Sequence, residues 1–113
     1  MQIIMNQTKV NERDCITFKK RDKEKNYVKI GYYLGCWSHI GKLVKAQEQP
    51  ISIDTDCLSV EIIVHELVHA LGFHHEHSRP DRDDYVKVIN ENIIEGTEKS
   101  ILLIKKLAIV IKF

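Results

Sequence analysis

The sequence is poor in several features that would point to particular classes of protein. It has no run of 18 apolar residues, so no segment is predicted to cross a membrane as a helix. Its 17 basic and 16 acidic residues nearly cancel, which excludes a polyanion-binding protein that works through bulk charge. The first residues, MQIIMNQTKVNERD, lack the basic region and cleavage site of a secretory signal. The 113 residues, 43% of them hydrophobic, therefore predict one small globular domain with no nucleic-acid partner.

Cysteine is also scarce, and its count is odd. The three cysteines are Cys15, Cys36 and Cys57. In a reducing compartment all three would be thiols, whereas a secreted protein would be expected to contain one pair and one unpaired cysteine. Composition leaves the three possible single pairings open.

The first half of the chain has the pattern of short strands followed by one helix. Residues 1–13 are compatible with the end of a helix, and the charged run 19–26 and the stretch 42–49 are typical of loops. Alternating or β-branched residues predict strands at Cys15–Phe18, Tyr27–Tyr32 and Ile51–Ile53. Strands that precede a helix in this way predict an α+β fold with a largely antiparallel sheet.

The segment Ser59–Leu71 is predicted to be a helix. A serine stands at the N-cap position, and Gly72 follows the last apolar residue, as a C′ glycine does. Apolar residues occupy nearly the whole circumference, so the helix is expected to be buried. His65, Glu66 and His69 are therefore unusual, because buried polar groups need partners.

These polar residues have the spacing of a zinc site. His65 and His69 are four residues apart, so both imidazoles project from one face of the helix. Glu66 is positioned to flank a metal and to take a proton from its water. Gly72 allows the chain to turn back, so that His75 supplies a third nitrogen. Three neutral histidines with an open position are typical of a catalytic zinc site. His39, His74 and His77 do not have this spacing and are interpreted as surface residues of loops.

The chain resembles the astacin family of zinc metalloendopeptidases, in the metzincin clan. The resemblance rests first on the segment HELVHALGFHHEHSRPDRD, residues 65–83. It extends to Gly35-Cys36-Trp37-Ser38, to Cys15-Ile16-Thr17-Phe18, and to Asp84-Tyr85-Val86 with Asn92-Ile93. Together these motifs cover about residues 8–99.

The resemblance implies a function. One Zn²⁺ per chain would be held by His65, His69 and His75, and Glu66 would activate the zinc-bound water as general base and then protonate the leaving amine. The substrate would be a protein or peptide, and the protein would be extracellular. The fold would be the N-terminal subdomain of a zincin, a twisted, largely antiparallel sheet packed on a buried active-site helix. Oligomeric state is left open.

The resemblance also implies structural roles. Cys36 and Cys57 would form a disulfide that brackets the fourth and fifth strands of the family fold. Gly72, Glu76, Arg79 and Asp81 would be structural residues at the site. Paired arginine and aspartate side chains suit the fastening of the loop that carries them.

The chain departs from the family pattern after the third histidine. No methionine follows, because the only two are Met1 and Met5, so the Met-turn and the tyrosine after it are absent. The expected partner of Cys15 lies beyond the last residue. We therefore expect a truncated peptidase domain over residues 1–100 and an unmatched hydrophobic and basic tail over 101–113. The alternative function is that of a non-catalytic zinc-binding fragment or incomplete gene model.

Overall fold

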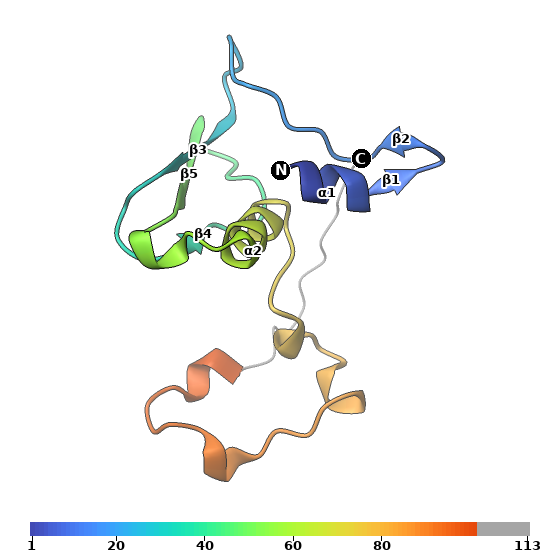
Figure 1. Ribbon diagram of the computed structural model, residues 1–113. Coiled ribbons are helices and arrows are strands. Elements are labelled where there is room, and N and C mark those ends of the chain that lie inside the picture. The colour runs from blue at the N-terminus through green and yellow to red at the C-terminus, as the bar shows by residue number, and fades with distance from the viewer. Residues whose placement is uncertain (102–113) are drawn as a thin grey trace. The chain divides into compact units, whose positions relative to one another are not determined.

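The computed structural model describes residues 1–101 and divides into two units, Met1–Leu71 and Gly72–Phe113 (Figure 1). It contains both helices and strands, which confirms the α+β class. Within the described residues, no helix has both the length and the apolar character needed to cross a membrane. Apart from Ile101, the tail expected at 101–113 lies outside the described residues.

The first unit contains a hairpin and a three-stranded sheet. Its strands are β1 (Lys9–Val10), β2 (Arg13–Asp14), β3 (Tyr27–Gly31), β4 (Trp37–Ser38) and β5 (Glu48–Ser52). β1 and β2 pair antiparallel. In the larger sheet the order is β3-β5-β4, with β3 parallel and β4 antiparallel to β5. The sheet is therefore mixed, and its longest pairing, of five residues, is the parallel one.

Two of the three predicted strands are confirmed and one is wrong. The strand expected at 27–32 is β3, and the one expected at 51–53 is the end of β5, which already begins at Glu48 inside the expected loop. Cys15–Phe18 forms no strand, because no neighbouring strand pairs with it. The alternation of apolar and polar residues in this segment still matches its burial, since Ile16 and Phe18 pack against the core while Cys15 is exposed. The structure also contains β4, which the sequence did not predict.

Two helices complete the first unit. They are α1 (Gln2–Gln7) and α2 (Val60–Ala70), and a short 3₁₀ helix, η1 (Thr55–Cys57), precedes α2. The predicted capping of α2 is confirmed, since the Ser59 hydroxyl accepts a hydrogen bond from the Ile62 amide at 3.3 Å. Gly72 follows with φ +109°, in the region that favours glycine.

The core of the first unit joins three elements. Ile4 from α1, Ile51 from β5 and Leu67 from α2 form its centre, and Ile51 is fully buried on the central strand. Only one side of α2 is buried, because it packs against β4 and β5, and Val60 at its start is 55% exposed. The partly buried residues around the centre are Ile16, Phe18, Ile53, Ile63, Val64, Val68, Ala70 and Leu71.

The second unit contains only short 3₁₀ helices among its described residues. They are η2 (Glu76–Ser78), η3 (Arg82–Asp84), η4 (Asn90–Asn92) and η5 (Glu98–Ile101). Few of its apolar side chains are buried, so ion pairs and turns define its local structure.

Candidate metal centre

The helix α2 brings two of the predicted ligands together. His65 and His69 lie one turn apart, and their ring centroids are separated by 4.4 Å with the rings nearly perpendicular. His69 is buried and His65 is exposed. The i, i+4 spacing therefore produces the juxtaposition expected from the sequence.

The third predicted ligand belongs to the same group. One ring nitrogen from each of His65, His69 and His75 lies within 4.8 Å of the other two. Within residues 1–101, these three histidines are the group of side chains whose arrangement could hold a metal ion. Three imidazoles are a donor set that zinc favours in catalytic sites. The residues present therefore fit the metal that the motif implies.

Glu66 lies between the two helical histidines in the sequence and is buried, with 6% of its surface exposed. Its Oε2 atom is buried and has no hydrogen-bond partner. Buried polar atoms are nearly always paired, so such an atom requires an explanation, such as an ordered water, an ion or a catalytic role. A carboxylate oxygen without a protein partner beside a histidine donor set is suited to accept a proton from water.

The remaining histidines differ from one another. His39 is exposed and lies edge-on to the Trp37 ring, as expected of a loop residue. His77 is also exposed, and its ring stacks on that of His75 at 5.3 Å. For His74 the expectation of a surface position is wrong, because the residue is half-buried and its Nε2 is buried without a hydrogen-bond partner.

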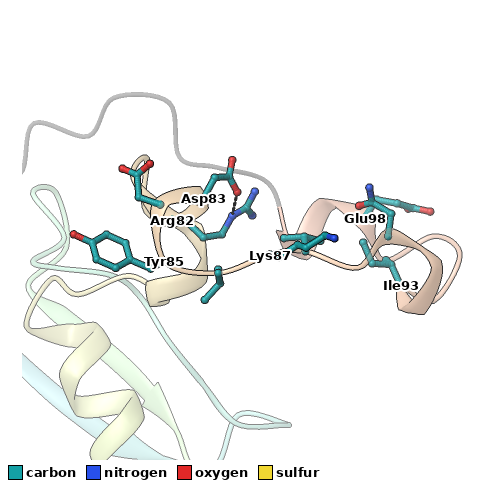
Figure 2. Close-up of a pocket in the computed structure, with 10 residues that line it drawn as sticks. Arg82, Asp83, Tyr85, Lys87, Ile93 and Glu98 are labelled. Atoms are coloured by element: carbon teal, nitrogen blue, oxygen red, sulfur yellow. Dashed lines mark hydrogen bonds and ion pairs between the residues drawn. The ribbon is translucent and has the colours of Figure 1, made fainter.

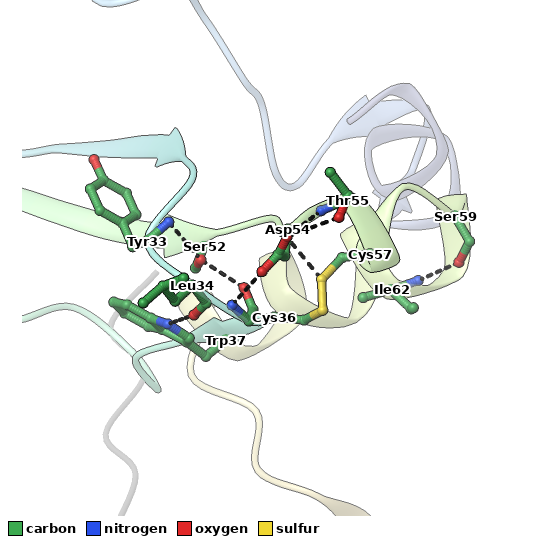
Figure 3. The surroundings of a disulfide bond; sticks show 11 residues. Tyr33, Leu34, Cys36, Trp37, Ser52, Asp54, Thr55, Cys57, Ser59 and Ile62 are labelled. Carbon is green, nitrogen blue, oxygen red and sulfur yellow. Dashed lines mark hydrogen bonds between the residues drawn. A yellow bond between two sulfur atoms is a disulfide. The ribbon is translucent and has the colours of Figure 1, made fainter.

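A disulfide joins the segment before β4 to the turn before α2. It links Cys36 to Cys57, whose Cα atoms are 5.9 Å apart, and so brackets β4 and β5 (Figure 3). Cys15 is a free, exposed cysteine. One of the three possible pairings, the one that the resemblance implied, is therefore present.

Side chains at the end of β5 hold the same region (Figure 3). The buried Ser52 hydroxyl donates to the Gly35 carbonyl at 2.7 Å and accepts from the Tyr33 amide at 3.0 Å. Asp54 accepts from the Gly35 and Thr55 amides at 2.8 and 2.6 Å. These backbone hydrogen bonds, that from Gly35 first, lower the pKa of Asp54. The role of Ser52 and Asp54 was not predicted from the sequence, in which the available signal was two polar residues within three positions of the apolar Ile51.

These features agree with comparisons to known proteins. A model of the peptidase family described as Astacin matches residues 1–109. The chain belongs to the astacin family.

Individual astacins resemble the chain over most of its length. It is 48% identical to zinc metalloproteinase nas-6 of Caenorhabditis elegans over 73% of the chain and 23% of that protein. It is 43% identical to meprin A subunit beta of Rattus norvegicus over 76% of the chain and 12% of that protein. Among solved structures, it is similar to high choriolytic enzyme 1, a hatching enzyme zinc-protease of Oryzias latipes, with a TM-score of 0.76 and 35% identity. That match covers 92% of this chain and 49% of the enzyme, so the chain spans less than half the length of the astacins it matches.

The astacin motif after the third histidine is fastened by ion pairs. Arg79 donates to both carboxylate oxygens of Asp81 at 2.9 Å and to Glu76 at 3.2 Å. The hydrogen bonds with Asp81 raise the pKa of Arg79, and those with Arg79 lower the pKa of Asp81. Bidentate arginine pairs of this kind fix geometry. Arg79 therefore joins Glu76 and Asp81 in one set of ion pairs after His75.

A large open hollow in the second unit does not coincide with the histidines. It has a volume of about 890 Å³, and Figure 2 shows Arg82, Asp83, Tyr85, Lys87, Ile93 and Glu98 around it. Arg82 is paired with Asp83 at 2.9 Å. None of the three motif histidines lines this hollow. The chemistry therefore points to the histidine group and not to this hollow.

Proposed function

We propose that the protein is a zinc-dependent metalloendopeptidase that hydrolyses peptide bonds in proteins. The observation that carries the proposal is the group of three histidines together with the buried, unpaired Oε2 of Glu66. Membership of the astacin family supports the same conclusion. In this proposal residues 1–100 form the peptidase domain.

His65, His69 and His75 would hold one zinc ion per chain, each through a neutral ring nitrogen. When bound, zinc would polarise the scissile carbonyl and lower the pKa of a water molecule in the site. Glu66 would accept the proton of the attacking water and then donate it to the amine that leaves. Its burial serves this role, because a carboxylate shielded from bulk solvent exchanges its proton with groups inside the site.

The proposed substrate is a protein or peptide, and the proposed location is extracellular. The Cys36–Cys57 disulfide supports the location, since such bonds persist in oxidising compartments. Glu76, Arg79 and Asp81 are proposed to hold the loop after His75 and to take no part in the reaction.

The test compares wild-type chain with two glutamate variants on the same helix. Zinc content is measured by elemental analysis, and cleavage is measured on casein. Glu66→Ala should retain zinc and lose cleavage by at least about 10²-fold. Glu61→Ala is the matched control, because Glu61 is exposed in the first turn of α2, and it should retain both.

A further variant, His65→Ala, should abolish stoichiometric zinc binding. Zinc that binds without Glu66-dependent cleavage would refute the peptidase proposal for this chain. That result would favour the alternative function of a non-catalytic zinc-binding module.

A further inference from the structure

The segment after β4 is held to the sheet by one side chain. The ladder between β4 and β5 ends at the pair Ser38–Ile51, so at Pro50 only the β3 side of β5 is paired. Beyond this point the side-chain amide of Gln49 replaces the ladder. Its Nε2 donates to the Gly41 carbonyl at 2.9 Å, and its Oε1 accepts from the Leu43 amide at 3.0 Å.

Gln49 is suited to this role because it is 6% exposed and both ends of its amide are used. An amide side chain both donates and accepts, as a peptide group does. A carboxylate of the same length accepts only. An apolar side chain would leave the Gly41 carbonyl and the Leu43 amide without these hydrogen bonds, at a cost in stability.

The loop that Gln49 holds contacts the metal centre through the backbone. The Gly41 amide donates to the His69 carbonyl at 2.9 Å. His69 lies in the last turn of α2, where carbonyls have no partner four residues ahead in the helix, and its carbonyl also accepts from the Leu71 amide at the C-cap. Gly41 has φ +69°, a conformation that a residue with a Cβ adopts only at a cost. The contact is therefore specific to this loop conformation.

We propose that Gln49 is a positioning residue for His69. Its amide fixes the Gly41–Leu43 loop, Gly41 fixes the backbone of His69, and the backbone sets where the imidazole reaches. The role as ligand positioner rests on the proposed function, in which His69 holds zinc. Groups that hydrogen-bond directly to a metal-binding side chain commonly change metal affinity by about 10- to 100-fold when removed, and Gln49, which acts through the Gly41 backbone, is expected to fall at the lower end of that range.

The test uses two substitutions at Gln49 in the full chain. Gln49→Met keeps the approximate shape of the side chain and removes both hydrogen bonds. Gln49→Glu keeps an acceptor for Leu43 and removes the bond to Gly41. Gln47→Met is the matched control, since Gln47 is exposed on the same segment. Ile51→Val controls for a general loss of stability at a fully buried position of the same strand.

Two readouts separate positioning from stability. Zinc affinity is measured by competition with a chelator, and the visible spectrum of the cobalt-substituted chain reports ligand geometry. We expect both Gln49 variants to bind zinc about tenfold or more weakly, with altered cobalt bands, and both controls to match the wild-type chain. Hydrogen exchange of the metal-free chain should show faster exchange at the Gly41 amide in the Gln49 variants only.

Unchanged Gly41 exchange in Gln49→Met would overturn the proposal, whatever the metal results. The proposal would also be overturned if the Gly41 amide exchanged faster in the Gln49 variants while their zinc affinity and cobalt spectrum equalled those of Ile51→Val. A wild-type chain that binds no zinc would refute the proposed function instead, and exchange alone would then decide whether Gln49 holds the end of α2.

Discussion

The Cys36–Cys57 disulfide should be a large part of the stability of this small chain. The bridge closes a loop with a sequence separation of 21. The chain-entropy relation for a loop of that size gives a stabilisation of about 3.3 kcal/mol at 25 °C. Total stabilities of small domains are about 5–15 kcal/mol, so loss of the bridge removes between about a fifth and two-thirds of the stability.

The variant that tests this value is Cys36→Ala, because Cys36 is exposed and Cys57 is fully buried. Replacing Cys57 would also remove the sulfur that accepts a hydrogen bond from the Asp54 amide at 3.3 Å. Apart from the wild-type chain, every protein in the experiment carries Cys15→Ser, which removes the exposed free thiol and so prevents disulfide exchange.

Urea unfolding followed by circular dichroism gives the free energy of unfolding of each form. Cys36→Ala, and the Cys15→Ser protein reduced with a phosphine, should each lose about 3 kcal/mol, with the urea midpoint shifted accordingly. The Cys15→Ser protein should match the wild-type chain to within about 0.5 kcal/mol. A loss below about 1 kcal/mol in both bridge-free forms would refute the entropic argument.

Three further predictions concern the ends of β5 and α2. The pKa of the Asp54 carboxyl is lowered by its hydrogen bonds, so the carboxylate stabilises the folded chain above about pH 4 and loses that contribution as the pH falls through its folded-state pKa. The free energy of unfolding, measured from about pH 6 to pH 3, should therefore depend less on pH in Asp54→Asn than in the wild-type chain. Ser59→Ala should lower the free energy of unfolding by about 0.5–2 kcal/mol in urea titrations through loss of the helix cap, and no change would contradict the capping role. Gly72→Ala should lower the free energy of unfolding by about 1 kcal/mol or more, because the φ of Gly72 is +109°. The same substitution should weaken zinc binding by displacing His75, and retained stability and zinc affinity would show that the turn tolerates a Cβ.

The part of the fold that local chemistry determines was predictable from the sequence. The helix expected at 59–71 is observed at Val60–Ala70, because a serine cap and a C′ glycine mark its ends. The juxtaposition of His65 and His69 follows from helical spacing alone.

The sheet was less predictable because its pairing is not local. β4 has only two residues, Trp37 and Ser38, which is too short for a periodic pattern. Cys15–Phe18 has the alternation of a strand, but its faces are set by packing on the core and not by a ladder. The alternation of apolar and polar residues indicates which side of a segment is buried. It does not identify the strand with which that segment pairs.

The candidate site shows the same contrast between local features, which the sequence predicts, and contacts between distant segments, which it does not. The three proposed ligands and Glu66 lie within eleven consecutive residues, 65–75, so a local motif is sufficient to identify them. The residues that hold the loops on both sides of β4 come from β5 and the turn after it: Gln49, Ser52 and Asp54. They act through backbone N–H and C=O groups, which nearly every residue carries, so these hydrogen bonds leave no side-chain motif in the loops that they fix. Substitutions at Gln49 are therefore expected to alter the metal centre while every residue of the motif is unchanged.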